Sequence, residues 1–257
     1  MDGAKMMPMS IPFALQLWSV RDVAQTDLMD TLARVADFGY KGVEFAGLQG
    51  HTPDAVRRRL DEVGLRCVGT HTTIDRFSDA NLAATIEEHH TLGTDIALVP
   101  WIPAEKRNTV ESTTATAREL TDLSEKLAEN KLRTGFHVHN DDLHPLPGSE
   151  RTAWDLIRTN TPDSFIMQWD TANGQSAGVG PLEPLREAGA RAVSIHLKEF
   201  PTDGRIIGEG QIPWFDVMNL AKEVGVQNYV VEIEQYAHRT SLDAVRDCLY
   251  ALQQLGY

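Results

Sequence analysis

The stretch Gly189-Ala190-Arg191-Ala192-Val193-Ser194-Ile195-His196-Leu197-Lys198 contains the pattern that decides the fold. A glycine ends an amphipathic segment, a few polar residues follow, and an apolar β-prone run begins. Glycine just past a helix end adopts the left-handed backbone conformation without a Cβ penalty. A continuous apolar run is typical of a strand buried on both faces of a parallel sheet. The same pattern starts at Gly39, Gly64, Gly93 and Gly225.

Further apolar runs complete a set of eight expected strands, and they lie at residues 13–17, 132–139 and 165–169. Helical patterns alternate with the strands, as at residues 27–36, from Pro53 onward, at 109–129 and at 241–255.

This alternation predicts a single (β/α)8 TIM barrel over residues 1–257, with residues 1–10 as a disordered or loosely attached tail. A doubly wound open sheet is the competing architecture. It usually carries a glycine-rich fingerprint after its first strand, and residues 16–22 have none. The barrel is therefore the preferred fold.

Composition limits the classes of function. The chain has 257 residues, of which 42% are hydrophobic and 24% charged, and its net charge is −13. Such a charge argues against a nucleic-acid partner. No run approaches the ~20 apolar residues of a membrane span, and no signal-peptide pattern opens the chain. Cys67 and Cys248 form no spacing motif and are expected to be buried. We expect a cytoplasmic protein.

Four segments in the second half of the chain, at 135–142, 167–170, 193–198 and 229–234, end in carboxylates or imidazoles. The carboxyl ends of barrel strands form the functional site, so these groups are expected to converge there. Two carboxylates and an imidazole suit Mn²⁺, Mg²⁺, Co²⁺ or Zn²⁺.

Each of these residues also has a structural interpretation when it is taken singly. Asp170 fits a helix N-cap or a turn before an expected loop at 171–174, His196 fits a satisfied core imidazole, and Glu232 fits an ion pair. Taken together, so many polar strand ends are costly to bury without a cation. The joint interpretation favours a metal.

The ordered set of motifs resembles the xylose-isomerase-like TIM-barrel superfamily, in particular its sugar phosphate isomerases/epimerases. The resemblance runs from about residue 13 to the C-terminus, and the motifs that carry it are residues 15–22, 39–44, His71, 196–198 and 231–232.

This resemblance implies acidic metal ligands from the fifth, sixth and eighth strands and a histidine from the seventh. The implied ligands are Asp142, Asp170, His196 and Glu232. Relatives often place a glutamate where this chain has Asp142, so His137, His139 or Asp141 are alternatives for the fifth-strand position.

The other strand-end side chains are candidates for a polyol pocket. We expect proton transfer from the set Glu44, His137, His139 and Lys198, and substrate contacts from His71, Trp18, Trp101 and Trp214. Core packing is an equally good interpretation of the tryptophans. Lys198 shares a strand face with His196, whereas Glu199 lies on the opposite face and is expected to be structural.

The predicted function is a divalent-metal-dependent sugar isomerase or epimerase, or a related eliminase. It would remove a proton next to the carbonyl of a ketose or keto-sugar. Mn²⁺ is the preferred ion, and the expected partner is a small sugar or sugar derivative, with homo-oligomerisation left open. The alternatives are a non-catalytic sugar-binding barrel with a degenerate metal site and an apurinic-site endonuclease-like phosphodiesterase.

Overall fold

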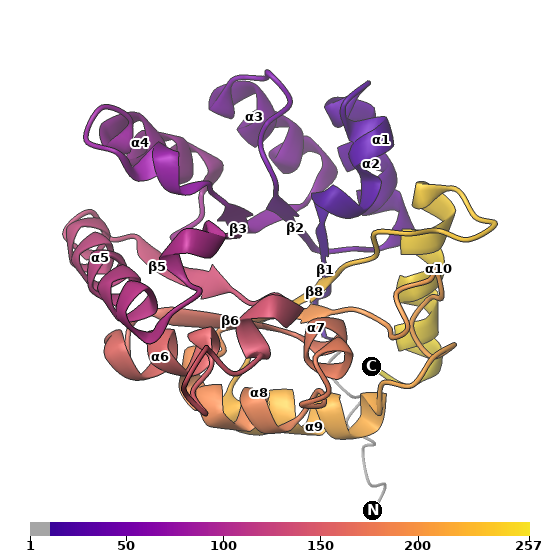
Figure 1. The fold of residues 1–257 in the computed structure, drawn as a ribbon. Helices are drawn as coiled ribbons and strands as arrows, with labels where there is room; N and C mark the ends of the chain where they lie inside the picture. Colours follow the sequence, from indigo (N-terminus) through magenta and orange to yellow (C-terminus); the bar gives the residue numbers. More distant parts are fainter. Residues whose placement is uncertain (1–10) are drawn as a thin grey trace, which may run out of the picture.

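The computed structural model describes residues 11–257, so the predicted tail at 1–10 lies outside the described residues. Eight parallel strands follow one another in chain order and form a closed barrel, in which β1 pairs with β8 (Figure 1). The predicted (β/α)8 fold is confirmed. The strands are β1 Ala14–Gln16, β2 Gly42–Phe45, β3 Arg66–His71, β4 Ile96–Val99, β5 Arg133–His137, β6 Ile166–Asp170, β7 Ser194–Leu197 and β8 Asn228–Val231.

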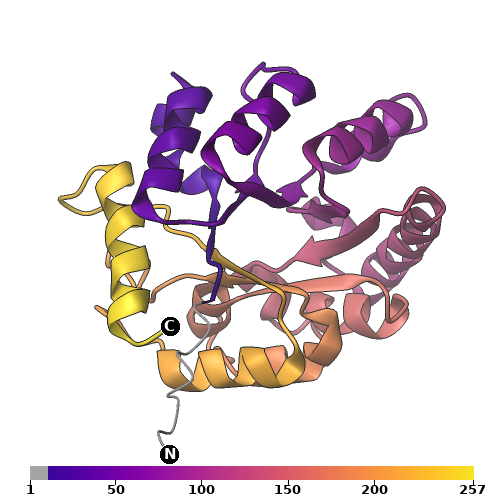
Figure 2. The same cartoon turned by 180° about the vertical axis from the view of Figure 1, so that it is seen from behind.

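Helices surround the barrel as an outer ring, which is also visible from behind (Figure 2). They are α1 Arg21–Ala24, α2 Leu28–Phe38, α3 Pro53–Val63, α4 Leu82–Leu92, α5 Val110–Ala128, α6 Ala153–Asn160, α7 Thr171–Ser176, α8 Glu183–Ala188, α9 Trp214–Val224 and α10 Ser241–Gln254. Short 3-10 turns lie at η1 Leu17–Val20, η2 Ile74–Phe77, η3 Ala104–Lys106, η4 Asn140–Leu143 and η5 Gly189–Arg191.

Four of the five predicted helix-ending glycines adopt the left-handed conformation: Gly39, Gly64, Gly93 and Gly225. Gly189 differs, because its φ of 55° is combined with a ψ of −136°. It ends α8 and opens η5, so a short turn precedes β7.

One prediction about local structure is wrong. Residues 171–174 were expected to form a loop, but they belong to the short helix α7. The carboxylate of Asp170 caps this helix by accepting a hydrogen bond from the backbone N–H of Asn173 at 2.7 Å. Asp170 therefore ends a strand and begins a helix at the same point.

The strand register brings polar side chains to one level inside the barrel. Asp170 on β6 is paired with His196 on β7, and His137 on β5 with Gln168 on β6. Gly135 permits the close approach of β5 and β6, because a Cβ there would lie 2.2 Å from the carbonyl oxygen of Ile166. A small cluster of buried apolar residues, Ala14, Val68 and Val230, joins β1, β3 and β8.

The two cysteines are free and buried, as expected, and burial raises the pKa of both Cys67 and Cys248 to about 12. No helix within residues 11–257 has the length and apolar character needed to cross a membrane.

Candidate metal and substrate site

Four buried side chains from neighbouring strands meet at the carboxyl ends of the barrel. Each of them offers one ligand atom, and all four atoms lie within 4.8 Å of one another. The group comprises His137 at the end of β5, Asp170 at the end of β6, His196 in β7 and Glu232 just after β8. A set of two imidazoles and two carboxylates suits a divalent cation of the Mn²⁺ or Zn²⁺ type. We call these four residues the metal-candidate cluster.

The tautomer of His137 leaves one nitrogen free for a metal. Its Nδ1 lies 2.9 Å from Oε1 of Gln168. An amide oxygen can only accept, so Nδ1 carries the hydrogen and Nε2 keeps its lone pair. Burial, together with the charges of the neighbouring histidines, lowers the pKa of His137 well below its usual range. The ring is therefore neutral, as a metal ligand must be.

Asp170 contributes an oxygen that the described residues do not satisfy. Its Oδ1 caps α7, whereas Oδ2 is buried and accepts no hydrogen bond. The nearest cation, Nζ of Lys198, is 4.0 Å from Oδ2. Burial raises the pKa of Asp170 to about 6 against the lowering effect of Lys198. Buried polar atoms without partners are rare in folded proteins, and a bound cation would satisfy this one.

His196 lies between two carboxylates. Its Nε2 is 2.7 Å from Oε2 of Glu44 and its Nδ1 is 3.2 Å from Oε2 of Glu232. Burial opposes a charged ring, but the two carboxylates outweigh it and raise the pKa of His196 to about 10. Metal-binding histidines generally donate their second nitrogen to such a carboxylate. Glu44 therefore fits an orienting role, and Nδ1 is the nitrogen directed toward the cluster. Because the raised pKa keeps this ring protonated near pH 7, a bound metal would have to displace the proton from Nδ1.

Lys198 balances part of the negative charge. Its buried Nζ lies 3.2 Å from Oε2 of Glu232 and also contacts the carboxylate of Glu234. Burial alone would lower the pKa of Lys198, but these carboxylates and Asp170 raise it. The side chain is thus a fixed ammonium beside the cluster, on the same side as His196, as the strand alternation predicts.

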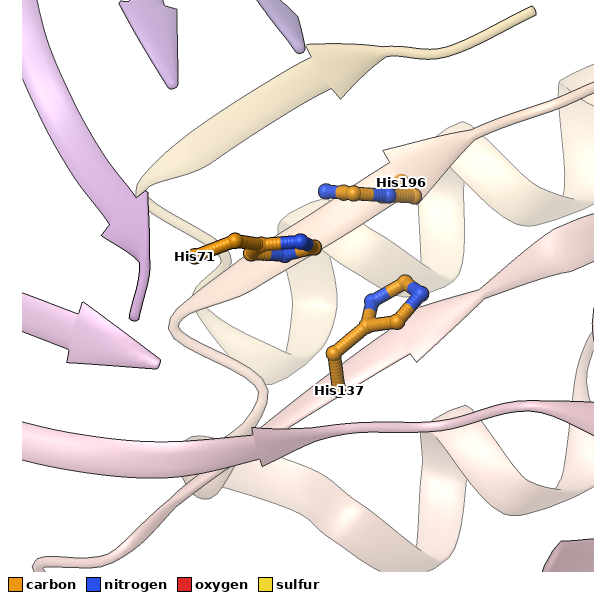
Figure 3. Close-up of side chains that lie close together, drawn as sticks. All are labelled: His71, His137 and His196. Carbon is orange, nitrogen blue, oxygen red and sulfur yellow. The ribbon is translucent and has the colours of Figure 1, made fainter. Parts of the chain in front are cut away.

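The imidazoles of His71, His137 and His196 approach one another from three different strands (Figure 3). The rings of His71 and His196 are nearly parallel, with centroids 5.3 Å apart. These three histidines form a second possible ligand group. However, Nε2 of His71 already faces Gln168 and Glu44, at 2.9 and 3.2 Å. The mixed group is the better cation site, because its two carboxylates supply negative charge.

A cavity of about 690 Å³ lies beside the cluster. This volume is in the range of small-molecule sites. Trp18 and Trp101 line it and are 44% and 54% exposed, so flat apolar surfaces face the space. The predicted site residues that line the cavity are Trp18, His71, Trp101, His137, His139, Lys198 and Glu232.

Comparison with known proteins agrees with this architecture. Residues 32–254 match the family described as xylose isomerase-like TIM barrel. The chain belongs to this family. The family resemblance inferred from the strand-end motifs is thus confirmed.

Individual relatives of this xylose isomerase-like barrel are distant in sequence. The rhizopine catabolism protein MocC of Rhizobium meliloti is 25% identical over 236 residues, covering 82% of this chain and 71% of the relative. A sugar phosphate isomerase/epimerase from Parabacteroides distasonis superposes with a TM-score of 0.83 at 20% identity, over 99% and 98% of the two chains. The IOLI protein, solved with a bound zinc atom, gives a TM-score of 0.74 at 15% identity, over 95% and 98%.

Two predicted site residues lie elsewhere. The carboxylate of Asp142 accepts a hydrogen bond from the backbone N–H of His139 at 2.8 Å and pairs with Arg107 at 2.9 Å. It lies in the turn η4 beyond β5, and His137 represents the fifth strand in the cluster. Trp214 is only 5% exposed and does not line the cavity, because its indole N–H donates to the buried carboxylate of Glu199 at 2.8 Å.

The sequence interpretation missed the residue that organises the cluster. Nε2 of Gln168 donates to Glu44 and Ser194, at 2.8 and 2.9 Å, and its Oε1 faces the imidazoles of His71 and His137. The available signal was strand alternation, since Gln168 lies two residues before Asp170 and therefore points to the same side of β6. Gln16, which donates to Glu44, and Glu234, which lines the cavity, were also missed.

Proposed function

We propose that this barrel is a divalent-metal-dependent sugar isomerase or epimerase that removes a proton next to a carbonyl. The observation that carries the proposal is the metal-candidate cluster, with its unsatisfied Asp170 oxygen, beside a cavity walled by Trp18 and Trp101. Family membership and the isomerase/epimerase among its structural neighbours support the reaction class. We propose Mn²⁺ as the ion, with Mg²⁺, Co²⁺ and Zn²⁺ as alternatives.

A bound divalent ion would supply Lewis acidity, which makes a C–H next to a carbonyl easier to deprotonate. Of the predicted proton-transfer residues, His139 fits the base best. It lines the cavity, and its buried Nδ1 has no hydrogen-bond partner among the described residues. Burial lowers the pKa of His139 to about 4, so the ring is neutral near pH 7 and one of its nitrogens keeps a free lone pair.

The remaining candidates fit supporting roles. Lys198 lines the cavity as an ammonium and can donate a hydrogen bond to a substrate oxygen. Glu44 is 1% exposed and lies behind His71 and His196, where it orients both rings. Burial would raise the pKa of Glu44, but those imidazoles and Gln168 hold it below its usual range. It therefore remains an ionised acceptor.

One observation favours a second candidate, a sugar-binding barrel without catalysis. His196 pairs with Glu44 and Glu232, and Lys198 pairs with Glu232, so part of the cluster's charge is compensated within the protein. Phosphodiesterase activity has less support, given the net charge of −13.

Solvent-deuterium exchange distinguishes these functions. Purified protein is loaded with Mn²⁺, or treated with chelator, and incubated in D₂O with a panel of ketoses and keto-sugars, and the C–H signals next to the carbonyl are followed by NMR. We expect metal-dependent loss of one such signal. Metal binding without any exchange would favour the binding barrel, and exchange that survives full metal removal would contradict the proposed role of the metal.

A further inference from the structure

A buried hydrogen-bonded chain leads from α4 to the cavity wall. Nδ1 of His89 is 2.6 Å from the carbonyl oxygen of Thr85, and its Nε2 is 2.6 Å from the hydroxyl of Thr70. The hydroxyls of Thr70 and Thr72 are 2.7 Å apart. His89 is fully buried, whereas both threonines line the cavity and neither belongs to the metal-candidate cluster.

The chemistry of the chain fixes the direction of its hydrogen bonds. A backbone carbonyl only accepts, so Nδ1 of His89 carries a hydrogen. Burial lowers the pKa of His89, and the ring is neutral near pH 7, with Nε2 accepting from Thr70. The hydroxyl hydrogen of Thr70 is then used in the bond to His89, and the hydroxyl oxygen of Thr70 accepts a hydrogen bond from the hydroxyl of Thr72. Thr72 in turn has no hydrogen left to donate, so its oxygen offers only lone pairs to a ligand.

The charges along the cavity also disfavour an anion. The lysine and arginine among the described lining residues are Lys198 and Arg76. Both are already paired, Lys198 with Glu232 at 3.2 Å and Arg76 with Glu88 at 3.0 Å. Glu234 adds a third lining carboxylate. A phosphate group would meet an excess of negative charge and no unpaired lysine or arginine from this part of the chain.

We infer that the cavity receives the far end of the sugar as an uncharged hydroxyl that donates a hydrogen bond to Thr72, and that His89 is the positioning residue for this acceptor. The inference rests on the proposed function for the orientation of the sugar, with its carbonyl end at the cluster. It assigns an unphosphorylated sugar as the substrate class, and Thr72 as a specificity-determining residue.

The test uses the four D-2-ketohexoses, and each of these parent sugars is compared with its 6-deoxy form and with its 6-phosphate. The dissociation constant of every compound is measured by NMR titration of the Mg²⁺-loaded protein. We expect a parent sugar to bind more tightly than both derivatives. Thr72→Val should weaken the parent sugar about three- to tenfold, the value of one neutral hydrogen bond, and leave the 6-deoxy form unchanged. Thr72→Ser should restore the wild-type ratio between the dissociation constants of the 6-deoxy form and the parent sugar.

The ratio of the 6-deoxy to the parent constant is the decisive readout, because general structural damage weakens both sugars alike. His89→Gln should reduce this ratio, as Thr72→Val does, with unchanged metal content. Tighter binding of a 6-phosphate, an unchanged ratio in Thr72→Val, or no binding by the whole panel would overturn the inference. Binding of a parent sugar without deuterium exchange would support it while contradicting the proposed catalytic function.

Discussion

The carboxylate of Glu199 holds the segment between β7 and α9, and its replacement by glutamine is a sharp test of the structure. Oε1 accepts hydrogen bonds from the backbone N–H groups of Phe200 and Ile212, at 2.9 and 3.1 Å. Oε2 accepts from the backbone N–H of Gly208 and the indole N–H of Trp214, at 2.7 and 2.8 Å. The residue is 4% exposed, so water cannot replace these bonds freely.

A glutamine has one oxygen, and its amide NH₂ would face two of the four donors. Each lost hydrogen bond to a buried charged group is worth about 1.5–3 kcal/mol, so Glu199→Gln should lower the free energy of unfolding by about 3–6 kcal/mol. Glu209→Gln is the matched control in the same segment. The side chain of Glu209 is 43% exposed and pairs with Arg239, so its replacement should lower the free energy of unfolding by less than about 1 kcal/mol.

The assay is urea denaturation followed by tryptophan fluorescence and circular dichroism. If Glu199→Gln and Glu209→Gln lose similar stability, the four-bond arrangement does not hold this segment and the reasoning is refuted. A loss of stability in Glu199→Gln alone would also explain why Trp214 packs in the core and does not line the cavity.

Three further predictions follow from the other buried polar groups. Asp142→Ala should lower the free energy of unfolding by about 3–5 kcal/mol, because it removes the carboxylate that pairs with the largely buried guanidinium of Arg107, while the metal content should stay at the wild-type level. The variant of the exposed neighbour, Asp141→Ala, is the control. Loss of metal in Asp142→Ala would contradict the placement of Asp142 outside the cluster. His139→Gln should slow deuterium exchange by about 10²- to 10⁴-fold and retain the metal, as checked by NMR and elemental analysis, and an unchanged rate would exclude it as the base. The pKa of His89 is lowered in the folded protein, so the unfolded chain binds the proton more readily and the contribution of His89 to stability is lost as pH falls below about 6.5. Denaturation curves at several pH values should therefore show that the free energy of unfolding depends less steeply on pH in His89→Gln than in wild type. The same steepness in both proteins would contradict the neutral ring.

Much of the fold and part of the site were predictable from local patterns. The apolar runs and the glycines that precede many of them give the eight strands, because parallel strands buried on both faces and helix ends leave clear signals. The positions of Asp170, His196 and Glu232 at strand ends follow from the count of eight strands, and the structure brings all three together with one further candidate ligand, His137.

The remaining features depend on contacts that are distant in sequence. Asp142 turns away from the cluster toward Arg107, a partner 35 positions earlier in the chain, and no local pattern indicates that pair. Trp214 is buried because Glu199 accepts its N–H. Gln168 looked like an ordinary strand residue, since its role appears only when four other strands supply its partners.

We propose that the metal-candidate cluster binds a divalent cation. Elemental analysis after Mn²⁺ loading and dialysis tests it most directly, with Asp170→Asn as the variant, because asparagine can still cap α7 but lacks the carboxylate charge. The exposed Asp216→Asn is the control. We predict about one ion per chain in wild type and control, and far less in Asp170→Asn. Equal metal content in all three proteins, or none in wild type, would contradict the claim.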